Sequence, residues 1–449
     1  MSFTQGLVRA RSHLIFLFGL ITAFSMVIWL ESIDVQGAQG RKGPSSSSEA
    51  AAAMITFSEQ RQATTTPRKL TEKEREWANI AWKYFKNNTV AETGLVNSVD
   101  GYQSSTLWDT SSYLMAIIAA ERLQIIPETE FNERITAVLK SLAAIPLFDN
   151  QLPNKVYHTK SLAMVDYKNQ AREKGIGWSA IDIGRVLVPF NILVWNYAEH
   201  TPAVEKVMQR WDLTEMIKDG TLYGADLSQK GKIAYLQEGR LGYEEYAAKS
   251  FGLMGMDVSV ALDYLNYVNF VDIYGTSVAT DSRDPDIYQA HNYVVSEPYI
   301  LDGIEYGWDR ISRELAWRVY EAQEKRYQET GILTAVSEDS IDQEPYFVYN
   351  TVFTDGKAWN AITEDGADAS AYKTLSTKAA FGWHMIYETD YTRKLMERVA
   401  EAYDPERGWY AGIYEADNKP NKALTANTNG IVLETLAFRE SGTLLKVGR

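Results

Sequence analysis

The spacing of hydrophobic positions predicts a succession of helices from Thr71 to the C-terminus. Apolar residues recur every three or four positions in one stretch after another, which places them on one face of a helix. The first stretch opens with Thr71 and Glu74, whose spacing matches a capping box. Helices are expected from 71 onward and then at 107–124, 128–144, 179–199, 204–211, 243–251, 299–330, 369–387, 392–403 and 425–441. Strand-like runs are short and few, so the pattern favours an all-α domain.

Two segments ahead of this domain have a different pattern. Residues 14–30 form an unbroken apolar run behind Arg9 and Arg11, which is typical of a signal peptide or an N-terminal membrane anchor within residues 1–38. A buried globular helix is the alternative for this run. Residues 39–69 are rich in Ser, Ala, Gln and Thr and predict a flexible linker. We therefore expect an exported protein with a 70–449 domain that is periplasmic, membrane-anchored facing the periplasm through residues 14–30, or secreted.

Several predicted helices follow a loop that combines glycine, an aromatic residue and a carboxylate. Examples are the loops that lead to Trp108-Asp109 and from Gly177-Trp178 to Asp182, and the segments 239–243 and 408–412. Helical hairpins stacked around an axis would bring such loops to one rim. The sequence therefore predicts an (α/α)6-type toroid of helical hairpins with few short strands in the rim loops. A plain irregular helical bundle is the alternative architecture.

Composition excludes several classes of function. The 449 residues are 45% hydrophobic and 23% charged, as in globular proteins, and the net charge of −14 disfavours nucleic acid as a partner. There is no cysteine, and the five histidines are scattered singly. Gly-x-Ser-x-Gly, Walker, Gly-x-Gly-x-x-Gly and His-Glu-x-x-His motifs are all missing from the sequence. We expect no metal and no cofactor, and a monomer.

Carboxylates that lie among aromatic residues are the remaining candidates for catalytic groups. Glycosidic cleavage needs one carboxylic acid to protonate the leaving oxygen and a second carboxylate as base or nucleophile. The 12 Trp and 27 Tyr residues suit sugar stacking. The candidate catalytic residues are Asp109, Asp182, Glu238 and Glu297.

Two of these candidates have a structural alternative. Asp109 follows Trp108 where a helix begins, so it could serve as a helix cap. Asp182 lies three positions before Arg185 and could pair with it along the helix. Glu238 lies in a loop with two glycines and is freer to reach a substrate.

A second set of residues is predicted to bind substrate. Glu297, Asp302 and Glu305 with Tyr299 and Trp308 predict an acidic pocket with aromatic walls, because the stretch contains no lysine partner. An exposed acidic face with ordinary core aromatics is the alternative. The predicted substrate-binding residues are Trp108, Trp178, Arg240, Tyr243, Glu244, Tyr299, Asp302 and Trp308.

The segments 106–109, 237–244 and 296–299 carry a resemblance. They resemble a family of exported bacterial proteins classed as a domain of unknown function, over roughly 71–440. That family is similar to glycoamylase-like and β-1,2-glucanase-type (α/α)6-barrel glycoside hydrolases. The resemblance implies a carbohydrate cleft where the inner helices begin, and acid catalysis by Glu or Asp without metal. It also implies that inversion of the anomeric configuration is the commoner outcome.

The leading hypothesis is a cell-envelope glycoside hydrolase that cleaves a β-glucan or exopolysaccharide by carboxylate acid/base catalysis. Its partner would be an oligo- or polysaccharide. One alternative is a non-catalytic glycan-binding or polysaccharide-export scaffold protein. A polysaccharide lyase that uses Tyr, His or Arg is a third hypothesis, which the negative net charge disfavours because its substrate is a uronate.

Overall fold

The computed structural model describes residues 55–59, 61–228 and 230–446. The chain divides into two compact units, Met1–Thr56 and Phe57–Arg449, and every element below belongs to the second. None of the helices in the described ranges has the length and apolar character needed to cross a membrane. The predicted signal or anchor at 14–30 lies outside the described residues.

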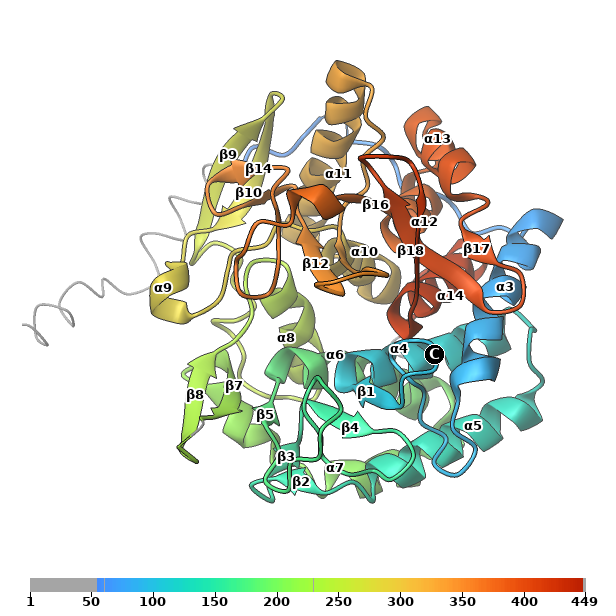
Figure 1. The fold of residues 1–449 in the computed structure, drawn as a ribbon, viewed down its shortest axis with the longest axis vertical. Helices are drawn as coiled ribbons and strands as arrows, with labels where there is room; N and C mark the ends of the chain where they lie inside the picture. Colours follow the sequence, from blue (N-terminus) through green and yellow to red (C-terminus); the bar gives the residue numbers. More distant parts are fainter. Residues whose placement is uncertain (1–54, 60, 229, 447–449) are drawn as a thin grey trace, which may run out of the picture. The chain divides into compact units, whose positions relative to one another are not determined.

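A closed ring of helices forms the centre of the Phe57–Arg449 unit (Figure 1). Within the described residues, six helices contact one another in chain order, and the last of them contacts the first. They are α4 (Leu107–Arg122), α6 (Ala180–Asn196), α8 (Tyr243–Leu253), α10 (Glu297–Leu301), α12 (Thr377–Tyr387) and α14 (Ala426–Ser441).

Further helices pack outside this ring and alternate with the ring helices along the chain. These are α3 (Glu72–Asn88), α5 (Glu128–Leu142), α7 (Thr201–Met208), α11 (Arg310–Thr330) and α13 (Asp390–Val399). Between α8 and α10 along the chain, a hairpin takes the place of an outer helix. The hairpin consists of β9 (Val268–Ile273) and β10 (Thr276–Asp281), and the short α9 (Pro285–Tyr288) follows it. Strand β10 packs on α11.

Strands are more numerous than the sequence pattern predicts, and all pairs are antiparallel. Two sheets have four strands: β7 pairs with β5, β6 and β8, and β18 pairs with β16, β17 and β19. The other strands form sheets of two or three. The strands apart from β9 and β10 are β1 (Ser104–Thr106), β2 (Leu147–Phe148), β3 (Leu152–Pro153), β4 (Val156–His158), β5 (Gly177–Trp178), β6 (Ile217–Lys218), β7 (Thr221–Leu227), β8 (Ile233–Gln237), β11 (Glu338–Ser340), β12 (Phe347–Asn350), β13 (Phe353–Thr354), β14 (Lys357–Ala358), β15 (Ala361–Ile362), β16 (Thr374–Ser376), β17 (Tyr403–Asp404), β18 (Gly408–Tyr414) and β19 (Pro420–Leu424).

Local sequence signals set the helix boundaries. The predicted capping box of Thr71 and Glu74 is confirmed at the start of α3. The single helix predicted at 299–330 is wrong, because the chain breaks between the π-helical turn Asp302–Tyr306 and α11. Gly307 adopts φ of 85°, and Asp309 accepts hydrogen bonds from two backbone N–H groups of the first turn of α11. A left-handed glycine followed by a capping aspartate ends one helix and begins another.

Small residues allow the ring helices to approach closely. A Cβ on Gly184 of α6 would lie 2.7 Å from the Cβ of Ala247 in α8. A Cβ on Gly430 of α14 would lie 2.9 Å from the carbonyl oxygen of Ser112 in α4. Larger residues at these two positions would push neighbouring ring helices apart.

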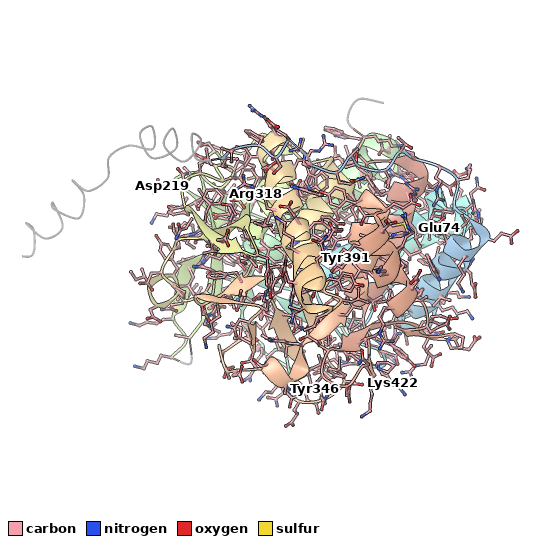
Figure 2. The ribbon with its side chains drawn as sticks, turned by 90° about the horizontal axis from the view of Figure 1, so that it is seen from above. Glu74, Asp219, Arg318, Tyr346, Tyr391 and Lys422 are labelled. Carbon is pink, nitrogen blue, oxygen red and sulfur yellow. The ribbon has the colours of Figure 1, made fainter. Side chains whose placement is uncertain are left out.

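The ring helices begin on one face of the unit and end on the other. Trp108 at the start of α4 contacts Tyr243 at the start of α8 and Glu297 at the start of α10. At the other face, Arg122 at the end of α4 donates to the carbonyl oxygen of Leu444, which follows α14. In Figure 2, Tyr346, which directly precedes β12, and Lys422, which lies in β19, are at the lower edge, whereas Glu74 and Arg318 are in the upper part of the view. We call the side where the ring helices begin the N-terminal face.

Residues 57–59 and 61–69 pack on the opposite side of the unit, which differs from their prediction as part of a flexible linker. The backbone N–H and hydroxyl of Ser58 donate to the Glu314 carboxylate of α11, and Arg61 pairs with the same carboxylate at 3.1 Å. The backbone N–H of Thr65 donates to the carbonyl oxygen of Ile386 at the end of α12. The compact unit therefore begins at Phe57, ahead of the predicted boundary at residue 70.

Candidate active site

Two acids occupy equivalent positions at the N-terminal face. Asp109 is the third residue of α4 and Asp182 is the third residue of α6, and these two helices are neighbours in the ring. The hydroxyls of the N-cap residues Thr106 and Ser179 each accept a hydrogen bond of 3.0 Å from the backbone N–H of the acid. Thr106 and Ser179 are thus the caps, and both acids keep half-buried carboxyl groups at the face.

Glu238 joins this pair from the end of β8. Its carboxylate accepts hydrogen bonds of 2.6 Å from the hydroxyl of Ser179 and from the backbone N–H of Ala180. The side chain therefore occupies the N-terminus of α6, where the helix dipole favours negative charge. The structure thus brings Asp109, Asp182 and Glu238 together.

Asp182 is held protonated to an unusually high pH for an aspartate. Burial and the neighbouring charge of Glu238 raise the pKa of Asp182 to about 7. Burial also raises the pKa of Asp109 and that of Glu238. Lys155, which pairs with Asp226 at 2.5 Å, opposes the increase in the pKa of both Asp182 and Glu238. Acid/base catalysis needs acids in one site whose pKa values differ, so that one carries a proton while another does not.

Glu297 lies at the same face but is buried and fully engaged. Its Oε1 accepts hydrogen bonds of 2.9 Å from the Trp108 indole and from the Asn427 amide, and its Oε2 pairs with Lys378. These partners come from the starts of α4, α14 and α12. Glu297 therefore joins four ring helices and fixes the half-buried indole of Trp108 beside the acids.

A buried carboxyl group lies behind this network. Asp339 of β11 is 3.7 Å from the Lys378 ammonium, and burial raises the pKa of Asp339 to about 8. Glu297 also raises the pKa of Lys378 above its usual value, although burial acts against this. Asp339 is therefore neutral below about pH 8, whereas Lys378 and Glu297 form a charged pair.

Beneath Trp108, a buried ion network crosses the ring. The Arg185 guanidinium pairs with Glu305 at 3.0 Å and with Glu434 at 3.1 Å, and all three side chains are fully buried. Arg185 also lies 4.8 Å from the ring centre of Trp108. Asp182 therefore does not pair with Arg185, which is the structural alternative for this acid, because Arg185 faces the ring interior.

Some predicted substrate-binding residues are part of the packing under the face. Trp178 is fully buried and donates to the carbonyl oxygen of Tyr223. Arg240 is buried and donates to Gln237, and Glu244 is buried in an ion pair with Arg283 at 2.7 Å. Tyr243 remains half-buried, and its ring makes an edge-to-face contact with Trp108.

The predicted pocket of Glu297, Asp302 and Glu305 does not form. Asp302 follows α10 and pairs with Lys249, which lies in the second half of α8, away from the N-terminal face. Trp308 donates to the carbonyl oxygen of Tyr299, whose side chain is buried. The stretch itself has no lysine, but Lys249 and Lys378 reach its acids from distant parts of the chain. Local composition could not reveal these pairs.

The sequence interpretation missed four groups at the face: Lys155, Lys378, Asn427 and Asp339. Lys378 and Asn427 are each the second residue of a ring helix behind a Ser or Thr, so the rule that finds Asp109 could have found them. Lys155 and Asp339 lie in or beside short strands and have no such signal.

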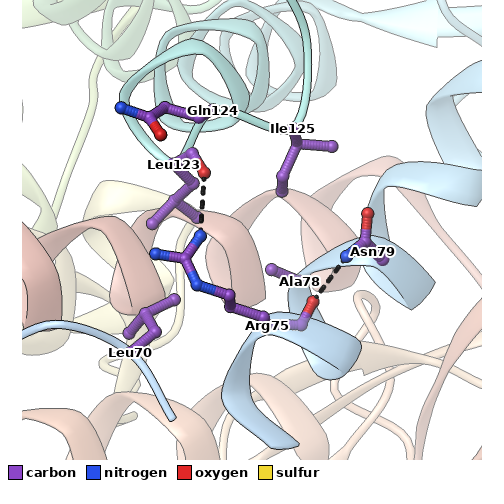
Figure 3. A pocket seen from close by; sticks show the side chains of 7 residues that line it. All are labelled: Leu70, Arg75, Ala78, Asn79, Leu123, Gln124 and Ile125. Atoms are coloured by element: carbon purple, nitrogen blue, oxygen red, sulfur yellow. Dashed lines mark hydrogen bonds between the residues drawn. The ribbon is translucent and has the colours of Figure 1, made fainter. Parts of the chain in front are cut away.

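A pocket of about 120 Å³ lies elsewhere, between α3 and the turn that follows α4 (Figure 3). The Arg75 guanidinium in this pocket donates to the carbonyl oxygen of Leu123 at 3.3 Å. The pocket is at the opposite end of α4 from Asp109, so it is separate from the acids. In the described part of the chain, no group of three or more His, Asp or Glu side chains is arranged to hold a metal ion.

Several solved structures share this fold. The endo-β-1,2-glucanase from Chitinophaga pinensis, solved with sophorotriose and glucose, is 12% identical and covers 84% of this chain and 94% of its own, with a TM-score of 0.56. The β-1,2-glucanase from Parabacteroides distasonis is 11% identical over 85% of this chain and 58% of its own, with a TM-score of 0.58. The glucoamylase from Saccharomycopsis fibuligera is 9% identical over 86% of this chain and 98% of its own, with a TM-score of 0.52. At these identities the likeness shows the fold, which confirms the predicted resemblance in architecture.

Among curated proteins, none matches the chain in sequence. A family model described as a protein of unknown function, DUF3131, matches residues 76–442, which confirms the predicted membership of a domain-of-unknown-function family. Because this match spans most of the chain, the protein belongs to the DUF3131 family.

Proposed function

We propose that the protein is a glycoside hydrolase whose closed ring of helices is the inner layer of an (α/α)6 toroid. The observation that carries this proposal is the group of Asp109, Asp182 and Glu238 beside Trp108 at the N-terminal face. The solved enzymes of similar fold are β-1,2-glucanases and a glucoamylase, so the proposed substrate is a β-glucan or a related exopolysaccharide.

Asp182 is the proposed general acid. A pKa of about 7 keeps its carboxyl group protonated at mildly acidic pH, as protonation of a glycosidic oxygen requires. Asp109 is the proposed base that activates water. Axes of packed helices lie about 8–10 Å apart, so equivalent positions on α4 and α6 suit the carboxyl spacing of roughly 6.5–9.5 Å found in inverting enzymes. Inversion at the anomeric carbon is therefore the expected outcome.

The location is part of the proposal. The apolar run at 14–30 behind Arg9 and Arg11 supports export, either with the run retained as an inner-membrane anchor or with it cleaved. The enzyme would then meet its glycan in the cell envelope, as a monomer. Fractionation of cells that express the full chain tests this, and recovery in the cytoplasm would contradict it.

The direct test measures reducing ends released from neutral β-glucans and bacterial exopolysaccharides by the full-length protein. Asp182→Asn and Asp109→Asn should each reduce the rate by about 10²-fold or more, whereas Glu205→Gln, on the exposed side of α7, should leave it unchanged. Nuclear magnetic resonance of the first product gives its anomeric form.

Binding of glycan without release of reducing ends would favour the alternative, a non-catalytic glycan-binding or export scaffold. An unsaturated product would instead indicate a lyase.

A further inference from the structure

We propose that Gly224 is a positioning residue for Glu238. The space beside its Cα, which the side chain of any other amino acid would fill, is where Glu238 passes to reach the start of α6. The inference deepens the proposed function, and only its kinetic readout rests on that function. Gly224 is not among the residues predicted from the sequence, because a single glycine in a strand gives no signal of what lies over it.

The strand order makes Glu238 reach across β7. In this sheet β7 lies between β5 and β8 (Figure 1). Glu238 follows β8, and its backbone N–H donates to the carbonyl oxygen of Leu222 in β7 at 2.9 Å. Its hydrogen-bond donors, the Ser179 hydroxyl and the Ala180 backbone N–H, follow β5 on the far side of β7. The Glu238 side chain therefore crosses the face of β7.

Gly224 marks the point of crossing. A Cβ on Gly224 would lie 2.5 Å from Oε2 and 3.1 Å from Cδ of Glu238. The next nearest atom is the carbonyl oxygen of Trp178, at 3.2 Å. Non-bonded carbon atoms in good contact are about 3.5–4.0 Å apart, so even the methyl group of alanine would displace the Glu238 carboxylate.

The backbone conformation does not require glycine at this position. Gly224 is not one of the glycines with a left-handed φ, so alanine could adopt its conformation. Gly177 in β5 differs, because its φ is 137° and a Cβ there would overlap the carbonyl oxygen of Ala225. Glycine weakens the interior of a strand and often marks the close approach of another group. At position 224 that group is the side chain of Glu238.

Displacement of Glu238 would change the chemistry of Asp182. The Ser179 hydroxyl donates to Glu238 at 2.6 Å and accepts from the backbone N–H of Asp182 at 3.0 Å, so the two acids meet at one side chain. Burial and then the charge of Glu238 raise the pKa of Asp182. Away from Ser179, this charge would act over a longer distance, and the pKa of Asp182 would fall.

The other ionisable groups around the two acids keep their places when Gly224 is replaced. Asp109 faces them from α4, Asp226 from β7, and Lys155 from the segment between β3 and β4. Lys155 and Asp226 are paired at 2.5 Å. Tyr167 is neutral, because burial and neighbouring carboxylates raise its pKa. Since the atoms nearest to a Cβ at position 224 belong to Glu238 and Trp178, Gly224→Ala acts on the acids through Glu238.

The first test is a double-substitution cycle in the full-length protein. Gly224→Ala and Glu238→Ala are made singly and together, and urea unfolding gives the midpoint of each variant. We expect Gly224→Ala to lower the midpoint in the wild-type background. In the Glu238→Ala background, where the crossing side chain is absent, it should leave the midpoint unchanged or raise it. Gly252→Ala is the matched control with equal effects in both backgrounds, since a Cβ there would meet its nearest atoms at 3.7 Å.

The second test uses a readout that a purely structural glycine would not move. Nuclear magnetic resonance titration of the Asp182 carboxyl in Gly224→Ala should show its pKa moving toward the value found in Glu238→Ala. A fall of about one unit would lower the protonated fraction about fivefold at pH 7 and leave it nearly unchanged at pH 5, and kcat/KM should follow.

Equal losses of stability from Gly224→Ala in both backgrounds would overturn the proposal. So would a pKa of Asp182 that shifts in Glu238→Ala but not in Gly224→Ala. If Gly224→Ala alone does not fold, folding of the double variant supports the proposal, and failure of the double variant overturns it. Absence of hydrolysis by wild-type protein would instead overturn the proposed function, while unfolding and titration would still decide whether Gly224 positions Glu238.

Discussion

Replacement of Arg185 by methionine should destabilise the protein by about 3–5 kcal/mol, the usual cost of breaking a buried ion pair. Arg185 contacts Glu305 at 3.0 Å and Glu434 at 3.1 Å, with all three side chains fully buried. At an effective dielectric constant of about 20, each contact is worth about 5 kcal/mol of attraction. Desolvation offsets much of this in the intact network, but the substitution removes the attraction and leaves two buried carboxylates without their cation.

The pH dependence gives this prediction a second signature. Burial already raises the pKa of Glu434 well above its ordinary value, and Arg185 counteracts this. Without Arg185 the folded-state pKa rises further above the unfolded value. A carboxyl with a raised folded pKa stabilises below its unfolded pKa and loses that contribution as pH rises. Arg185→Met should therefore cost more stability at pH 8 than at pH 5.

The assay is urea unfolding of the full-length protein followed by circular dichroism at both pH values. Lys73→Met is the control, because Lys73 makes an exposed pair with Glu76 worth about 1 kcal/mol or less. Adding Glu305→Gln and Glu434→Gln to Arg185→Met should recover part of the loss. A loss below about 1 kcal/mol for Arg185→Met, or a loss that shrinks as pH rises, would refute the reasoning.

Three further results are expected. In wild-type protein, kcat/KM should fall as pH rises through about 7, because Asp182, the proposed general acid, then loses its proton, and a pH profile measures this. Lys155→Met should move that fall to higher pH, since the Lys155 charge lowers the pKa of Asp182; a shift to lower pH would contradict this. Deletion of residues 57–69 should cost at least about 3 kcal/mol, because hydrogen bonds to a charged group contribute about 1.5–3 kcal/mol each and Glu314 loses several. Urea unfolding measures the loss, which should be smaller near pH 4, since hydrogen bonds from Ser58 lower the pKa of Glu314 against the effect of burial.

The sequence predicts features that repeat locally. Helix starts follow from capping residues such as Thr71, and the positions of Asp109 and Asp182 behind Thr106 and Ser179 follow the same rule. Because ring helices run in the same direction, a residue type that recurs at their starts gathers on one face. This explains why these two acids could be placed near each other before any contact was known.

Contacts between distant parts of the chain are where sequence interpretation fails. Lys378 pairs with Glu297 across many residues, and Lys249 pairs with Asp302 from a different helix. Nothing within the 296–308 segment reveals these partners, so the segment taken alone predicts an acidic pocket. The strands are missed for a related reason: runs of two or three residues such as β5 are stabilised by pairing with β7 and have no periodicity of their own.

The position of Glu238 explains why the acids of α4 and α6 should differ in role. Thr106 donates its hydroxyl to the Asp109 carboxylate at 2.7 Å, whereas the equivalent hydroxyl of Ser179 and the backbone N–H of Ala180 both donate to Glu238. Glu238 thus shares the Ser179 hydroxyl, which still lowers the pKa of Asp182, but burial and then the charge of Glu238 act in the opposite direction and raise the pKa of Asp182 to about 7.

Glu238→Gln should therefore lower the pKa of Asp182 and move the fall in kcat/KM to lower pH. Glu238→Ala should do the same, because both substitutions remove the charge, while Glu205→Gln provides the unaffected control. Titration of the Asp182 carboxyl by nuclear magnetic resonance measures the pKa without relying on turnover. A pKa of Asp182 that stays near 7 in both variants would show that burial alone holds the proton, and that Glu238 does not make Asp182 the acid.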